Sequence, residues 1–301
     1  MSYRLGCGIV RVVINMRLKG IRRFHYARDL EEALSLLSAY GGRGAVLAGG
    51  LDLARSARAD LEGLIDISGL GLSYVRAEGG GLRIGATTTL TDLLESRPAR
   101  EYLGGFLGEV LRQVAAPPLR NQATFGGAVV SAHPWADIPT VLVALGAEVS
   151  FQDEAGRHKG LLEELWEKPF RHIFKGAVLT EVILPPWDGA FAFAKLTRSA
   201  YDIALLNCAC GLGIQDGRIS WARVALGATP RRGRRLPWLE DLLVGKEPGP
   251  GLWAEVKELV PEKVEVGTDR RASGDWRRAV AGPLLTRCLA RAARKVTGGN
   301  L

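Results

Sequence analysis

The chain has 301 residues, of which 47% are hydrophobic and 24% are charged, and these are ordinary values for a globular protein. Its length predicts two or three packed units, and no apolar run reaches the roughly 20 residues that a membrane-spanning helix needs. The net charge of +8 resides at the two ends, because residues 24–219 hold 18 basic and 23 acidic residues and sum to −5.

The first predicted unit alternates strands and helices. A strand end near Phe24 leads into a helix for which Asp29 is the expected N-cap, with two glutamates in the first turn. Gly41 and Gly42 are expected to end this helix. The hydrophobic pattern then predicts a strand over residues 45–47, a helix over 53–61 and a strand over 64–67.

The middle of the chain begins with a predicted β-hairpin, in which strands over residues 74–77 and 82–85 flank a glycine turn. Helices are expected over residues 91–95, 107–116 and 138–145, and strands over 147–151 and 179–184. Pro98 interrupts the first of these helices, and Pro117 ends the second. We interpret Pro185 and Pro186 as a domain boundary.

The final third shows strands first and helices afterwards, which is typical of an α+β unit. Strands are predicted over residues 191–196, 203–214 and 219–226. Helices are predicted over residues 231–245, 252–259 and 275–293, the last of them broken near Gly282 and Pro283.

Two glycine pairs are the strongest local features. Gly49 and Gly50 follow a buried strand, where the absence of a Cβ lets a ligand approach the main-chain N–H groups. Such N–H groups bind anions, phosphates in particular, although a plain turn is the simpler reading of one pair alone. Gly126 and Gly127 repeat the pattern after Thr124. Two such turns could grip the two phosphates of a dinucleotide.

Asp137 lies ten residues beyond Gly127 and is the nearest candidate for polar recognition. A carboxylate beyond a phosphate cradle can accept hydrogen bonds from the hydroxyl groups of a ribose or ribityl chain. Asp137 could equally cap the helix that begins at Ile138, or do both.

Several other classes of site are disfavoured. The sequence contains neither a P-loop nor a GxGxxG motif that opens a βαβ unit. The histidines are scattered without HxxxH spacing, so we expect no protein metal site. The basic cluster of Arg231, Arg232, Arg234 and Arg235 lacks interleaved aromatic residues and any recognition motif, which favours a solvated face or subunit contact over a nucleic-acid partner.

The cysteines and the N-terminus predict a cytoplasmic protein. Residues 1–15 lack a signal-peptide cleavage site, and translation could start at Met1 or at Met16. The four cysteines form neither a disulfide framework nor a CxxC pair. Cys208 and Cys210 would share one face of a strand, and without a nearby histidine they favour buried structural thiols over metal ligands.

The order of these motifs resembles a known family. The motifs are Ala-Gly-Gly-Leu-Asp at residues 48–52, Leu-Arg-Ile-Gly-Ala-Thr-Thr at 82–88, Arg-Asn-Gln-Ala-Thr-Phe-Gly-Gly at 120–127, and Asp137. Together they resemble the FAD-binding medium subunit of molybdenum hydroxylases, the group of the xanthine and carbon monoxide dehydrogenases. The segments at 193–198, 202–204 and 224–231 are similar to the later part of that family. The similarity runs from about Ile21 to near Val296.

The resemblance implies an α+β fold with a two-subdomain FAD-binding domain of the PCMH type and an α/β C-terminal domain of the CO dehydrogenase flavoprotein type. The expected domains are an N-terminal extension over residues 1–20, FAD-binding subdomains over 21–73 and 74–186, and the C-terminal domain over 187–301. The implied partners are a large subunit with the molybdenum cofactor and a small 2Fe–2S subunit. Electrons would reach the FAD from the iron–sulfur clusters and leave to NAD, a quinone, ferredoxin or oxygen.

The resemblance also implies residue roles. The pyrophosphate would be held by the backbone of Ala48, Gly49, Gly50, Leu51 and Asp52 and of Thr124, Phe125, Gly126, Gly127 and Ala128. Asp137 would bind hydroxyl groups of the flavin chain, Leu179 and Lys195 would line the flavin pocket, and Ile203 would pack near the ring. No residue of this chain is expected to be catalytic by itself, because the flavin carries out the redox chemistry.

Two positions depart from the family. Ala128 stands where an asparagine is usual, and Leu51 stands where a small hydroxyl residue is common. A lost hydrogen bond to a charged group costs about 1.5–3 kcal/mol, so weaker FAD binding is expected. The alternatives are a flavin-free assembly subunit, which Ala128 favours, and a free-standing flavin oxidase, for which the residues after Pro186 are too few.

Overall fold

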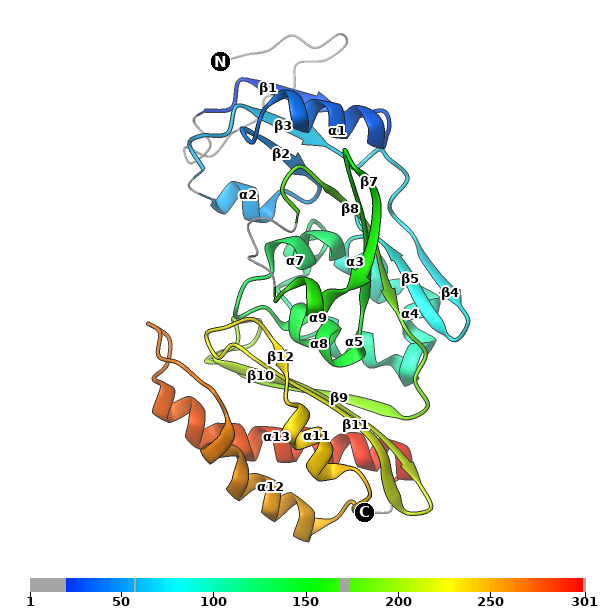
Figure 1. The fold of residues 1–301 in the computed structure, drawn as a ribbon, viewed down its shortest axis with the longest axis vertical. Helices are drawn as coiled ribbons and strands as arrows, with labels where there is room; N and C mark the ends of the chain where they lie inside the picture. The colour runs from blue at the N-terminus through cyan, green and yellow to red at the C-terminus, as the bar shows by residue number, and fades with distance from the viewer. Residues whose placement is uncertain (1–19, 57, 168–173, 300–301) are drawn as a thin grey trace.

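The computed structural model describes residues 20–56, 58–167 and 174–299, which form three sheets with their helices, one after another along the long axis of the molecule (Figure 1). Except for Gly20, the predicted N-terminal extension lies outside the described residues. Within the described part of the chain, no helix is both long and apolar enough to cross a membrane.

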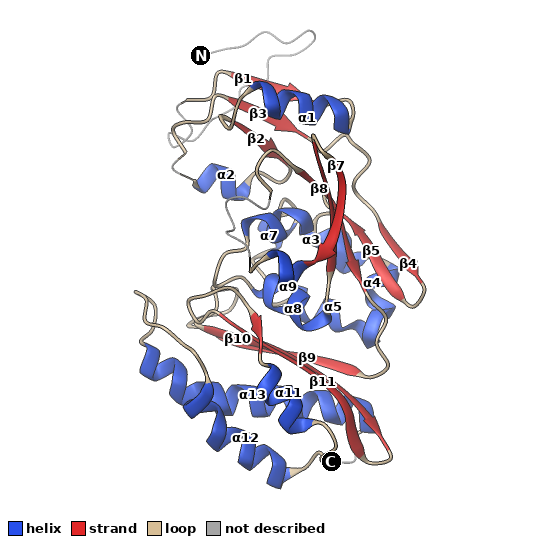
Figure 2. Ribbon diagram, in the orientation of Figure 1, coloured by secondary structure: helices blue, strands red, loops and turns tan. Residues whose placement is uncertain are grey.

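The first unit is a small parallel sheet with a helix on it (Figure 2). Its strand order is β1 (Arg23–Tyr26), β3 (Gly63–Asp66), β2 (Gly44–Leu47), with both pairs parallel. Helix α1 (Leu30–Ala39) makes the crossover from β1 to β2, as parallel strands require. Asp29 caps this helix by accepting a hydrogen bond from the N–H of Glu32, as predicted. The short helix α2 (Leu51–Arg55) follows β2.

The second unit is built on a five-stranded antiparallel sheet. Its strand order is β4 (Val75–Glu78), β5 (Gly81–Gly85), β8 (Val178–Leu184), β6 (Glu148–Asp153), β7 (Gly156–Leu161). The predicted hairpin of β4 and β5 is confirmed, and its turn has positive φ at both Gly79 and Gly80, as a tight two-residue turn requires.

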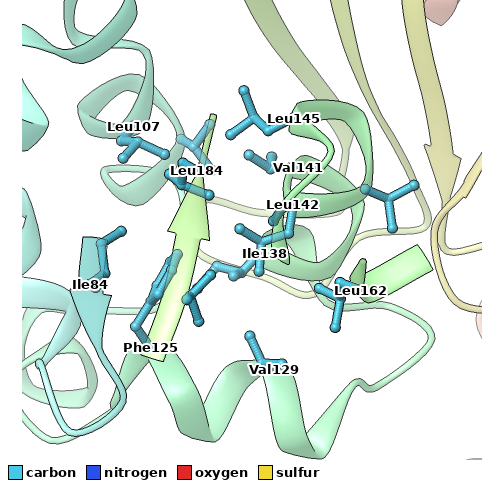
Figure 3. Close-up of a cluster of buried hydrophobic side chains, with 14 of the residues drawn as sticks. Ile84, Leu107, Phe125, Val129, Ile138, Val141, Leu142, Leu145, Leu162 and Leu184 are labelled. Atoms are coloured by element: carbon cyan, nitrogen blue, oxygen red, sulfur yellow. The ribbon is translucent and has the colours of Figure 1, made fainter. Parts of the chain in front are cut away.

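Helices fill the space between this sheet and the third unit. They are α3 (Leu90–Glu95), α4 (Arg97–Glu101), the 3₁₀ turn η1 (Tyr102–Gly105), α5 (Phe106–Leu111), α6 (Pro117–Arg120), α7 (Phe125–Ser131), α8 (Asp137–Leu145) and α9 (Leu162–Leu165). Every residue of α8 is buried. Ile138, Val141 and Leu142 project from it toward Phe125 of α7 and Leu184 of β8 (Figure 3). Apart from Asp137 and Thr140 this helix is apolar on every side, as expected of a helix inside a protein, and α8 packs between the second and third units.

The third unit is a four-stranded antiparallel sheet with helices on one face. Its strand order is β12 (Arg234–Arg235), β11 (Arg218–Gly227), β10 (Leu206–Gln215), β9 (Ala190–Leu196). Helices α11 (Pro237–Leu243), α12 (Pro250–Lys263) and α13 (Gly274–Thr297) cover the face away from α8 (Figure 1). The predicted α+β class is confirmed. The three sheets fall within the ranges 21–73, 74–186 and 187–301, whose boundaries stay a prediction.

Some predicted elements were wrong, mostly in length. The helix expected over residues 53–61 is α2, which ends because Ser56 is extended and its hydroxyl binds the carbonyl of Leu53. The helix expected from 107 to 116 stops at Leu111, and Ala115 has a positive φ. In the segment 231–245 the first ordered element is the strand β12, because its backbone pairs with β11.

Two glycine-containing sites also differ from expectation. Helix α13 continues across Gly282 and Pro283, where packing against α12 outweighs the missing proline N–H. A Cβ at Gly282 would overlap the carbonyl oxygen of Lys257 in α12, so the glycine permits this close packing. Gly126 and Gly127 do not form a turn, because they lie in the first helical turn of α7.

Candidate functional site

The first glycine pair connects β2 to α2 through a tight turn. Gly50 has a φ of +73°, a backbone conformation that favours glycine. A Cβ at Gly49 would overlap the carbonyl oxygen of Gln122, so this glycine lets the turn touch the segment that precedes α7. The two glycine pairs, 77 residues apart in the sequence, are therefore neighbours in the fold.

The first turn leaves a run of backbone donors open. Among the described residues, no acceptor is paired with the N–H groups of residues 49–53. The first internal bond after the turn runs from the N–H of Ala54 to the carbonyl of Gly50. Several adjacent N–H groups without internal partners are the feature that an anionic ligand such as a phosphate needs.

The second glycine pair differs, because its N–H groups are already used. Thr124 caps α7, accepting from the N–H of Gly127 at 3.2 Å. The N–H groups of Phe125 and Gly126 donate at 2.9 Å to the carbonyls of Thr88 and Ala86. Thr124 is 7% exposed and its hydroxyl oxygen already accepts from Gly127, so its hydroxyl proton and the exposed surface at Gly127 are what this segment can offer a ligand.

His133 joins the two segments. Its Nε2 lies 2.9 Å from Oδ1 of Asp52, and its ring stacks on Trp135 with centroids 4.7 Å apart. The hydrogen bond with His133 outweighs partial burial and lowers the pKa of Asp52. The guanidinium of Arg271 also lies over the Trp135 ring, 4.5 Å from its centroid. The segment 133–135 of the second unit therefore contacts both the first unit, through Asp52, and the third, through Arg271.

Asp137 lies at the centre of a buried polar cluster. Its Oδ2 accepts from Nζ of Lys195 at 2.9 Å, and its Oδ1 accepts from Nδ2 of Asn207 at 2.8 Å. The side chains of Asp137 and Lys195 are each only 7% exposed. Burial raises the pKa of Asp137, against the lowering by Lys195 and Asn207. Asp137 lies in the first turn of α8 but its side chain does not cap the helix, so the capping interpretation is wrong.

Lys195 is held by three acceptors, which the sequence does not reveal. Its Nζ also donates to the carbonyls of Gln113 at 2.6 Å and Asp202 at 3.4 Å. An ammonium group has three protons, so all of them have partners here. Ile203, next to Asp202, is 41% exposed and presents an apolar side chain at the surface beside this cluster.

Leu179 is a core residue of the second unit. It belongs to β8, is buried, and packs in the core of the second unit. A pocket of about 680 Å³ opens beside Tyr102 and Trp187, and none of the predicted site residues lines it.

Sequence reasoning missed His133 and Asn207 as site residues. Asn207 is an amide inside an otherwise apolar strand, fully buried, and a lone polar residue in such a run is the signal that could have revealed it. His133 immediately precedes Pro134 and Trp135, but its partner Asp52 lies 81 residues earlier. Only the tertiary structure brings those two together.

The basic cluster at residues 231–235 is partly neutralised. Arg231 pairs with Glu265 at 3.0 Å, and Arg235 pairs with Glu240. Arg235 also lies 3.5 Å from Glu163 of α9, so it links the second and third units.

Comparison with known proteins covers nearly the whole chain. Residues 18–187 match the family model of the FAD binding domain in molybdopterin dehydrogenase, and residues 191–292 match that of the CO dehydrogenase flavoprotein C-terminal domain. Caffeine dehydrogenase subunit beta of Pseudomonas sp. (strain CBB1) is 29% identical over 91% of this chain and 96% of its own length. The carbon monoxide dehydrogenase medium chain of Hydrogenophaga pseudoflava is 28% identical over 88% of this chain and 95% of its own. The solved structure of quinoline 2-oxidoreductase from Pseudomonas putida 86 matches with a TM-score of 0.84 at 27% identity, covering 93% of this chain and 98% of that chain.

Proposed function

The chain belongs to the family of FAD-binding medium subunits of the molybdenum hydroxylases, and from this premise we propose that it is the subunit through which electrons leave such an enzyme. Its cofactor is FAD. The proposed partners are a large subunit that carries the molybdenum cofactor and a small subunit with 2Fe–2S clusters. Electrons would come from those clusters and pass to an external acceptor, in the cytoplasm.

The open N–H groups of residues 49–53 carry this proposal, because they are the feature that fits the FAD pyrophosphate. The backbone of residues 48–52 would bind one phosphate. The segment 124–128 would contribute through Thr124 and Gly127 rather than through N–H groups, because those of residues 125–128 already donate to Thr88, Ala86 and Thr124. The close approach of Gly49 to the carbonyl oxygen of Gln122 places the two segments side by side, as binding of both to one pyrophosphate would require.

Asp137 would serve as the acceptor for hydroxyl groups of the flavin chain. Each of its carboxylate oxygens already accepts one hydrogen bond and has a lone pair left for another. Lys195 and Asn207 fix the orientation of this carboxylate. Leu179 and the stem of Lys195 would line the flavin pocket, and Ile203 would limit access to the ring. Bound FAD accepts and gives up electrons, while the protein sets its position and surroundings.

The visible spectrum of the purified full chain tests the proposal. We expect flavin absorbance in the blue region, and release by acid of FAD rather than FMN. A protein that stays colourless after reconstitution with FAD, yet is folded by circular dichroism, would instead be a flavin-free assembly subunit.

Purification from the native host tests the proposed assembly. A tag on this chain should bring down a molybdenum subunit and an iron–sulfur subunit in equal amounts. A flavin-containing chain recovered alone at low and at high salt would contradict the assembly but not the cofactor.

A further inference from the structure

Three cysteines gather in the core of the third unit. Cys208 and Cys210 belong to β10 and Cys288 to α13, and all three are fully buried. Their Sγ atoms lie within 4.8 Å of one another, and none is in a disulfide. The sequence places the first two on one face of a strand, but only the packing of α13 on that face adds the third.

The cluster contains thiols alone. Among the described residues, no histidine or carboxylate joins it, and its surroundings are apolar side chains such as Ala192 and Leu285. It lies on the face of the sheet opposite α8 and takes no part in the proposed flavin site. Single buried cysteines commonly pack as small apolar residues, but here three sulfur atoms from two elements converge on one point.

The hydrogen bonds of the cluster are those of thiols. Sγ of Cys288 lies 3.2 Å from the carbonyl oxygen of Ala192, and Sγ of Cys208 lies 3.9 Å from the carbonyl oxygen of Leu284. When three converging thiols bind a metal ion, the ion takes the place of their protons.

We propose that Cys208, Cys210 and Cys288 bind one thiophilic d¹⁰ metal ion through their three sulfur atoms. Soft thiolate ligands select ions such as Zn(II) and Cu(I). In a tetrahedral site with Zn–S bonds of about 2.3 Å the sulfur atoms are about 3.8 Å apart, so the present spacing needs only a small contraction. The carbonyl oxygen of Ala192, 3.2 Å from Sγ of Cys288, is placed to complete a fourth position.

Charge favours the divalent ion over the monovalent one. Three thiolates around Zn(II) carry a net charge of −1, whereas around Cu(I) they carry −2. A buried charge needs a partner. Arg291, three residues after Cys288 on α13, shares the carboxylate of Glu109 with Lys295, so these three side chains together keep one net positive charge. The bound ion would join α13 to β10, and its uptake would release the thiol protons to solvent, so binding strengthens as the pH rises.

Metal content of the full chain tests the proposal. A Cys7→Ser background removes the one cysteine outside the described residues. This protein is reduced, stripped of metal, and offered Zn(II), Cu(I) or Cd(II) without oxygen, then passed through a desalting column. We expect one retained ion per chain, and for Cd(II) an ultraviolet charge-transfer band with the intensity of three thiolates. A folded protein that retains none of the three ions overturns the proposal.

Variants separate the site from its surroundings. Cys288→Ala and Cys208→Ala should each lower the amount of retained metal at least tenfold. For any Cd(II) that stays bound, the charge-transfer band per ion should lose about a third of its intensity. Leu285→Ala, which truncates a fully buried neighbour on the same helix, should keep the metal although it weakens the core. Equal retention in folded Cys288→Ala contradicts the assignment. If Cys288→Ala does not fold, the metal retained by the parent and by Leu285→Ala still distinguishes a metal site from three cysteines that only pack.

Discussion

Gly49 takes part both in the packing of the fold and in the proposed FAD site. We predict that Gly49→Ala lowers FAD affinity and also destabilises the fold. The added methyl group would overlap a backbone carbonyl, that of Gln122, which cannot swing away as a side chain could. Overpacking of this kind costs about 1–3 kcal/mol. Fluorescence titration with FAD and urea unfolding of the apoprotein measure the two effects separately.

Gly69→Ala is the matched control. Gly69 belongs to the same unit, and a Cβ there would meet no atom within 4 Å. This variant should bind FAD as the parent does and unfold at the same urea concentration or slightly higher. If both alanine variants lose affinity equally, contact between the two glycine segments is not what shapes the site.

Ala128 is the position at which a side chain could add a hydrogen-bond donor that the backbone of this segment lacks. The N–H groups of Phe125, Gly126 and Ala128 bond within the protein, so a further donor must come from a side chain. We predict that Ala128→Asn raises FAD affinity by about 1.5–3 kcal/mol, roughly 10- to 100-fold. Ala128→Leu has a similar size and no donor, and should not raise the affinity. Equal affinities of the two variants in an FAD titration would contradict a hydrogen bond at this position.

At the scale of elements, the Asp137 cluster joins α8 to β9 and β10. We predict that Lys195→Met destabilises the protein by about 3–5 kcal/mol, because it leaves the buried carboxylate of Asp137 without its cation. The loss also frees the carbonyl of Gln113, which Lys195 binds at 2.6 Å. Urea unfolding at neutral pH measures the change in stability.

A second substitution tests the cause. Adding Asp137→Asn to Lys195→Met removes the unpaired charge and should recover part of the lost stability. It should not recover FAD affinity if Asp137 accepts hydroxyl groups of the flavin chain. A double variant that is less stable than Lys195→Met would show that the charge was not the problem.

For the whole molecule, the sequence pattern predicted the presence of helices and strands more reliably than their first and last residues. The apolar runs that became β3, β8, β10 and α8 were all identified, because burial on both sides leaves a continuous hydrophobic signal. The strand β7 was missed, because its residues Gly-Arg-His-Lys-Gly-Leu show no alternation of apolar and polar residues. It is the edge strand of its sheet and pairs only with β6. Helix α13 was predicted to break at Pro283, where tertiary packing overrides local propensity.

The predicted site shows the same division between local and tertiary information. The two glycine pairs and Asp137 could be selected as candidates from residue type and spacing. That Gly49 touches Gln122, or that Cys288 reaches Cys208, depends on how distant segments pack. Likewise, the capture of N–H groups in α7 by the carbonyls of Ala86 and Thr88 has no signature in the local sequence.

A chain of polar and aromatic contacts crosses all three units of the molecule. It begins at Arg277, fully buried, which donates to Asp269 at 2.8 Å and to the carbonyl of Leu205 at 2.9 Å. Asp269 also binds Arg271, which stacks on Trp135. Beyond Trp135 follow His133 and then Asp52, next to the first glycine pair. Substitution of Asp269 should therefore lower the stability of the whole molecule.

We predict that Asp269→Asn lowers the free energy of unfolding by about 3 kcal/mol at neutral pH. This is the lower end of the cost of breaking a buried ion pair. The cost stays low because backbone carbonyls still accept hydrogen bonds from Arg277 in the variant. Burial opposes ionisation of Asp269, but hydrogen bonds from Arg271 and Arg277 outweigh it and hold its pKa well below the usual range. A lowered pKa stabilises the fold above the unfolded value of about 3.9, and this contribution is lost as the pH falls through the folded value. The gap between parent and variant should therefore be full at pH 6–7 and shrink below about pH 4. Asp275→Asn, at an exposed position in the first turn of α13, should show almost no gap at any pH. A gap for Asp269→Asn that stays constant in urea unfolding from neutral to acidic pH would contradict the ion-pair origin.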